Sequence, residues 1–157
     1  MIVFSSPRAL LSQVGSRLGV SAPRSVPQQD IDAFGTLTGD RQWIHHDVSR
    51  ARGGPFGGPV AHGMLSLSLV MPLLDTVFRV DGAALVLNKG LDRVRFVAPV
   101  PAGASVRLTA ELMSAAVRPR GYVEAVVGVA LSLADDTDVC TARVRLLYQE
   151  SAWLIAS

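Results

Sequence analysis

The sequence predicts an α+β fold in which helices come first along the chain and a run of antiparallel strands follows. In the first half, apolar residues recur at helical spacing over 8–18 and 27–39, and a longer apolar segment covers 62–78. In the second half, apolar and polar side chains alternate as in a half-buried strand, most clearly over 93–97 and 140–146. Helices followed by strands in separate parts of the chain indicate an α+β arrangement rather than a parallel α/β sheet.

End signals delimit the first two predicted helices. Gly19 follows the last apolar residue of the first helix and is a stop signal. Pro27 opens the second helix, and Gly39 ends it. Residues 21–26 lie between the two helices and are interrupted by Pro23, which predicts a short extended piece at the edge of a sheet.

The central part of the chain combines a predicted loop with a predicted buried helix. Residues 39–59 predict a loop, because glycine and proline punctuate the segment repeatedly. A loop of this length in a compact domain is uncommon unless it carries function. The segment 62–78 is apolar on nearly all sides, so its helix should be buried. Such a helix needs a sheet that curls around it, which is the hot-dog fold: one long buried helix wrapped by a curved antiparallel sheet.

Five strands are predicted for the second half, separated by glycine, proline and aspartate breaks. They span residues 84–87, 91–97, 105–115, 122–133 and 139–148. Because such a sheet would leave an exposed edge, the sequence favours a homodimer whose sheets join edge to edge. The apolar share of 49% agrees with burial of surface between subunits.

Composition narrows the class of protein. The length of 157 residues predicts a single domain over 1–157. The net charge is +2, but the arginines are scattered among acids without a basic stripe, which argues against nucleic acid. The single cysteine, Cys140, rules out an intrachain disulfide and a cysteine-rich zinc site. Without a signal-peptide pattern or a long apolar span, we expect a cytoplasmic protein with no membrane partner.

The predicted loop contains residue types suited to acid/base chemistry. Asp40 and His45 are five residues apart, and an extended chain would separate them by about 17 Å. A turn at 41–43 would instead bring both side chains to one point, where they can hold a water molecule and exchange protons with it. Gly63 would open the buried helix. Its unpaired N–H is then suited to an oxygen that gains negative charge.

Each of these residues also has a purely structural interpretation. Asp40 alone fits a loop or cap residue, and His45 alone fits a hydrogen-bonded structural histidine. We expect His46 to lie at the surface or beside the site, and His62 to be a hydrogen-bonding residue at the helix start. Three histidines without a His-Glu-x-x-His pattern or a cysteine pair predict no metal site. Ser66 has no neighbouring base in sequence, which disfavours a nucleophilic serine.

Together the motifs resemble a known family, the MaoC-like dehydratases, which include the R-specific enoyl-CoA hydratases known as hydratase 2. The resemblance rests on Gly39-Asp40 with His45 five positions further on, and on the Pro-Val-Ala-His-Gly-Met run at 59–64. The sequence Gln-Trp-Ile-His at 42–45 is closer to the branch of nodulation protein N-like proteins and mycobacterial short hydratases.

The resemblance extends over most of the chain, with two departures. Residues 88–96 and 98–103 are typical of the same branch. The family usually has Asn-Pro where this chain has Gln42-Trp43, which leaves the shape of the local turn open. Met71 falls near a position where the family often has a serine.

The resemblance implies a homodimeric hot-dog enzyme without a cofactor that reversibly hydrates trans-2-enoyl-CoA to (R)-3-hydroxyacyl-CoA. It implies Asp40 and His45 as the catalytic pair and the Gly63 N–H as the oxyanion donor, with either acyl-CoA or an acyl carrier protein thioester as the substrate. Two alternatives remain. A hot-dog acyl-thioesterase would not need the spaced Asp/His pair, and a non-catalytic acyl-thioester binding subunit would have no reason to keep it. The sequence leaves the acyl chain length and the identity of the base open.

Overall fold

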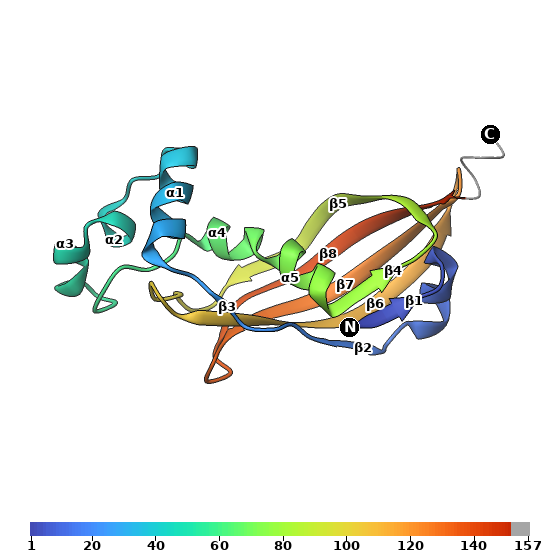
Figure 1. The fold of residues 1–157 in the computed structure, drawn as a ribbon, viewed down its shortest axis with the longest axis horizontal. Coiled ribbons are helices and arrows are strands. Elements are labelled where there is room, and N and C mark those ends of the chain that lie inside the picture. Colours follow the sequence, from blue (N-terminus) through green and yellow to red (C-terminus); the bar gives the residue numbers. More distant parts are fainter. Residues whose placement is uncertain (152–157) are drawn as a thin grey trace.

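A curved antiparallel sheet with two short helices along one face forms the body of the molecule in the computed structural model, which describes residues 1–151 (Figure 1). The strand order is β2-β6-β7-β8-β5, and β3 pairs with β6 beside β2. The strands are β2 (Arg17–Val20), β3 (Arg24–Ser25), β5 (Ala83–Phe96), β6 (Ser105–Arg118), β7 (Tyr122–Leu133) and β8 (Asp138–Glu150). Two further strands, β1 (Ile2–Phe4) and β4 (Phe78–Val80), form a small parallel sheet. The predicted hot-dog fold is confirmed.

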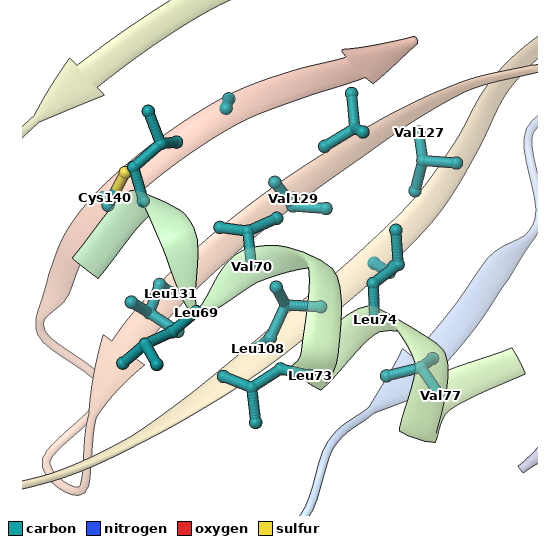
Figure 2. Packing of buried hydrophobic residues seen from close by; sticks show 14 of the residues in the cluster. Leu69, Val70, Leu73, Leu74, Val77, Leu108, Val127, Val129, Leu131 and Cys140 are labelled. Atoms are coloured by element: carbon teal, nitrogen blue, oxygen red, sulfur yellow. The ribbon is translucent and has the colours of Figure 1, made fainter. Parts of the chain in front are cut away.

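The core lies between the sheet and the helices α4 (Gly63–Ser68) and α5 (Val70–Val77). In Figure 2, Leu73 and Leu74 of α5 lie over the strands, in the same buried cluster as Leu108 of β6 and Val129 of β7. Burial of each such side chain contributes about 1.5–3 kcal/mol. This packing fixes α4 and α5 against the sheet and so fixes where the first turn of α4 lies.

The expectation of one long helix buried on all sides was wrong for the single chain. Residues 62–78 form two helices that meet at Leu69, and Pro72 lies in the first turn of the second, where its missing N–H costs no helical hydrogen bond. One face of the pair is uncovered and carries the exposed residues Met64, Ser68, Asp75 and Thr76.

Three helices gather beyond one end of the sheet (Figure 1). The predicted helix over 27–39 is confirmed as α1 (Gln28–Thr38), and Gly39 ends it in the left-handed conformation with φ 80°. The prediction of a plain loop over 39–59 was wrong, because the segment contains α2 (Trp43–His46) and α3 (Val48–Arg52). The carboxylate of Asp47 accepts a hydrogen bond from the Arg50 N–H and so stabilises the first turn of α3.

The N-terminal segment also differs from the expected helix over 8–18. A short 3-10 helix, η1 (Pro7–Gln13), buries Leu10, and the chain then turns at Gly15, where φ is 85°. The next residues pair with β6 as strand β2 and so provide partners for backbone groups along that edge of β6. The predicted extended piece over 21–26 is confirmed as β3.

Strand β5 joins two segments that the sequence predicted as separate. The break expected at Gly90 is a shift in register within one strand of 14 residues. Among the described residues β5 pairs only with β8, so its other edge is free, and nearly all of its residues are exposed. Within residues 1–151, no helix is both long and apolar enough to cross a membrane.

Candidate active site

The short segment 59–61 joins the helical end of the molecule to the sheet. The Val60 N–H donates a hydrogen bond to the Ile44 carbonyl of α2 (3.1 Å). The Ala61 N–H donates to the Val100 carbonyl, in the connection between β5 and β6 (2.8 Å). The two bonds point to opposite sides of the segment, so α2 is held against the start of α4.

His45 is buried on α2 with one ring nitrogen already committed. Its Nδ1 lies 2.7 Å from the Val60 carbonyl oxygen. Because a carbonyl only accepts, Nδ1 is the donor in this hydrogen bond, and Nε2 is the ring nitrogen that takes no part in it. The Gln28 amide donates to the His45 carbonyl and holds α2 against α1 (2.7 Å). The bonds to Val60 and Gln28 thus fix the orientation of the His45 ring and of the helix that carries it.

Asp40 is exposed and is positioned through its main chain. Its carbonyl oxygen lies 3.1 Å from Nε2 of both His46 and His62, and its side chain accepts from the Gln42 N–H (3.3 Å). The turn predicted at 41–43 therefore brings Asp40 back toward α2. A carboxylate oxygen of Asp40 and one ring nitrogen each of His45 and His62 all lie within 4.8 Å of one another. A water molecule that hydrogen-bonds at about 2.8 Å on each side fits between two such groups.

His62 contacts both members of the predicted pair, which the sequence did not indicate. Its ring is 3% exposed and stacks on His45, with centroids 3.8 Å apart and an angle of 27° between the rings. Because Nε2 donates to the Asp40 carbonyl, Nδ1 is a bare acceptor, and it has no partner among the described residues. Burial lowers the pKa of His62, although the hydrogen bond to Asp40 opposes this effect, so the ring is neutral near pH 7.

An apolar cavity of 320 Å³ opens beside these residues. Its lining includes His45, Gly63 and Ser66, together with Phe56, Phe96, Val97 and Val139. Ser66 is buried, and sequence reasoning had considered it only as a nucleophile. Such a lining suits an apolar ligand whose reacting end faces the histidine.

Gly63 lies at the boundary between the cavity and the start of α4. A Cβ atom at this position would lie 3.1 Å from the Phe96 ring, so glycine allows the ring and the backbone to approach closely. The Gly63 N–H belongs to the first turn of α4, where intrahelical acceptors are missing. His45 and Gly63 thus line one cavity, and the Asp40 side chain lies close to His45, while the roles of the three residues stay predictions.

The same three side chains form a possible metal-ligand set. Asp40, His45 and His62 offer three donor atoms, the number that catalytic zinc sites use. The prediction of no metal site rested on the absence of metal-binding motifs along the chain. The fold brings together three residues that are too far apart in the sequence to form such a motif. Chelation distinguishes a metal site from a water site.

Comparison with known proteins places the chain in a family. Residues 10–131 match the model of the MaoC like domain. A 3-hydroxyacyl-thioester dehydratase Z of Mycobacterium tuberculosis is 38% identical over 133 residues, covering 85% of this chain and 88% of the relative. Nodulation protein N of Rhizobium leguminosarum is 43% identical over 98 residues, which are 61% of each protein.

A solved structure agrees with this relationship. The fold superimposes on the R-hydratase PhaJ1 from Pseudomonas aeruginosa with a TM-score of 0.68 and 25% identity, covering 87% of this chain and 82% of that one. Since the family model spans most of the chain and the mycobacterial relative aligns over nearly its whole length, the protein belongs to the MaoC-like dehydratase family.

Proposed function

We propose that the protein reversibly adds water to trans-2-enoyl thioesters and gives (R)-3-hydroxyacyl thioesters, with Asp40 and His45 as the acid/base pair. The observation that carries the proposal is the convergence of a carboxylate and an imidazole within 4.8 Å, beside an apolar cavity. The mycobacterial relative is named a 3-hydroxyacyl-thioester dehydratase, which supports the substrate class. The solved neighbour is named an R-hydratase, which supports the (R) configuration of the product.

In the proposed reaction, Asp40 and His45 hold a water molecule between them. As the water oxygen attacks C3, one of the two side chains removes its proton, and the electron pair of the double bond moves toward the thioester carbonyl. The Gly63 N–H donates a hydrogen bond to the resulting enolate oxygen. A proton then returns to C2. Because α4 has only six residues, this role rests on the N–H itself rather than on a large helix dipole.

His62 is assigned a positioning role in this scheme. Its Nε2–H holds the Asp40 carbonyl, and its neutral ring supports the face of His45. A neutral ring adds no repulsion when His45 gains a proton during turnover. The acyl chain lies along the apolar cavity, against Phe56 and Phe96.

Removing either member of the pair should abolish most of the activity. Asp40→Asn and His45→Gln should each lower turnover by about 10²–10⁴-fold, since a positioned acid or base contributes this much. Turnover is measured by the absorbance of the enoyl-thioester band with crotonyl, hexenoyl and decenoyl substrates. Asp30→Asn, which removes an exposed carboxylate of α1 outside the site, is the matched control and should be near wild type. Near wild-type turnover in Asp40→Asn or His45→Gln contradicts the proposal.

Gly63 should be intolerant of a side chain for a catalytic reason. In Gly63→Val the new side chain meets the half-exposed Phe96 ring, which can move, so the protein should stay folded. The altered backbone position should cost about 10²–10³-fold in turnover, the effect of losing one oxyanion donor. Gly58→Ala is the control, because a Cβ there has nothing within 4 Å. Melting temperature and turnover are measured together, and an unfolded or fully active Gly63→Val counts against the role.

Activity should be independent of added metal. Prolonged dialysis against EDTA should leave turnover unchanged, because the proposed step needs only the water held by Asp40 and His45. Metal content by mass spectrometry and turnover are followed in the same samples. If chelation removes activity and one divalent ion restores it, the three donor atoms hold a metal instead.

The protein should be a homodimer joined through the free edge of β5. This edge is long and carries the exposed apolar residues Leu85, Val86, Leu87 and Leu91, a surface that proteins rarely leave uncovered. Light scattering should give twice the chain mass of 16.6 kDa at micromolar concentration, and Leu87→Lys should lower it toward the monomer. A wild-type monomer under these conditions rules out the dimer.

A further inference from the structure

A second cavity lies on the opposite face of the sheet from α4 and α5. It has a volume of 530 Å³. Along β7, the side chains of Val127, Val129 and Leu131 point to the helices, so Gly128 and Ala130 between them face outward. We call this cavity the arginine hollow. Its charged lining consists of Arg17, Arg93, Arg95, Arg143 and a single acid, Glu111.

A bulge in β5 concentrates positive charge there. The register pairs Asp92 with Arg143 and Arg95 with Thr141, so β5 has one more residue than β8 across this step. Arg93 takes up the difference with φ 52°, a conformation uncommon for residues other than glycine. As a result both Arg93 and Arg95 line the hollow, together with Arg143 of β8.

The four arginines lack the acid partners that other cations on this sheet have. On the same outer face, Glu124 binds Arg118, Arg145 and Lys89 at 2.9–3.0 Å. Within residues 1–151, none of Arg17, Arg93, Arg95 and Arg143 makes a salt bridge, although Glu111 is the cross-strand partner of Arg17. Four guanidinium groups against one carboxylate leave three positive charges around one cavity.

The floor of the arginine hollow is built from small side chains. Thr109, Gly128, Ala130 and Thr141 lie side by side on β6, β7 and β8. With Met113 packed against Gly128, these small residues leave a partly apolar surface between the arginines. A volume of 530 Å³ is within the range of about 300–1,000 Å³ that small-molecule sites occupy.

We propose that the arginine hollow binds a phosphate-bearing small molecule of nucleotide size. Guanidinium groups form paired hydrogen bonds with phosphate oxygens, and their planar faces stack on aromatic rings. The phosphates would contact the arginines of β5 and β8, and the base would lie over the small-residue floor. This site is separate from the cavity beside His45, and the proposal does not depend on the hydratase function.

Two other anionic partners fit the cavity less well. Nucleic acid needs a basic stripe that follows a backbone, whereas these four arginines gather around one cavity. A stable contact with an acidic protein buries about 800 Å² on each partner, which calls for a broad, flat surface. A hollow that collects guanidinium groups around small side chains suits a compact ligand better.

Calorimetric titration with ADP tests the proposal on the full-length protein. We expect ADP to bind with a Kd below about 1 mM and adenosine, which lacks phosphates, to bind at least about tenfold more weakly. Binding should weaken as salt is raised, since the contacts are ionic. The double variant Arg95→Gln/Arg143→Gln should weaken ADP binding about tenfold or more. Circular dichroism confirms that it is folded.

Two further variants separate a built site from general surface charge. Arg8→Gln removes one positive charge from an exposed arginine elsewhere and should leave ADP binding unchanged. Ala130→Phe keeps every charge but fills the floor of the hollow, and it should weaken binding as the double variant does. Absence of ADP binding, or equal binding by the wild type and the double variant, overturns the proposal.

Inhibition kinetics distinguish the two sources of such a ligand. If the nucleotide end of a coenzyme A thioester occupies the hollow, ADP should raise the KM for crotonyl-CoA but not for crotonyl-pantetheine. If a free nucleotide occupies it, the KM for both substrates should respond to ADP alike or not at all. Both results support the site and differ only in the source of the ligand. The calorimetric test needs no hydratase activity, so its result stands even if the protein is no hydratase.

Discussion

The main chain of Val60 and Ala61 ties together the parts of the molecule from which the candidate site is built. Val60 bonds to α2 through both of its main-chain polar groups, and Ala61 bonds to the connection that leaves β5. The packing of α4 and α5 on the sheet fixes the position of Gly63, and the bonds of Val60 fix α2 beside it. Without them, His45 would lie on a short helix of four residues, which has little stability of its own.

One of these bonds also determines which ring nitrogen of His45 is free. The Val60 carbonyl takes the Nδ1 proton of His45, so the nitrogen that remains free is the one that can act on water. His62 then serves two neighbours at once, since it holds the Asp40 carbonyl and stacks on the His45 ring. A carboxylate on a loop and an imidazole on a helix are thereby held at one point beside an apolar cavity.

Local signals in the sequence were sufficient for the fold class and for the convergence of Asp40 and His45. Gly39 ends α1, and the spacing of Asp40 and His45 allowed for the turn that brings them together. Contacts between distant segments were not predictable. His62 meets Asp40 from 22 positions away, and Phe96 at the end of β5 approaches Gly63 at the start of α4. The arginine hollow likewise collects residues that look scattered along the chain.

The most direct measurement uses an enoyl thioester in water enriched in oxygen-18, with the products followed by mass spectrometry and a thiol assay. The account predicts that the label appears in the hydroxyl group on C3, that the thioester stays intact, and that no free thiol forms. Label in a free carboxylic acid, with release of thiol, would show a thioesterase. Recovery of unlabelled substrate would show a binding subunit. Either of these results contradicts the assignment of Asp40 and His45 as a hydratase pair.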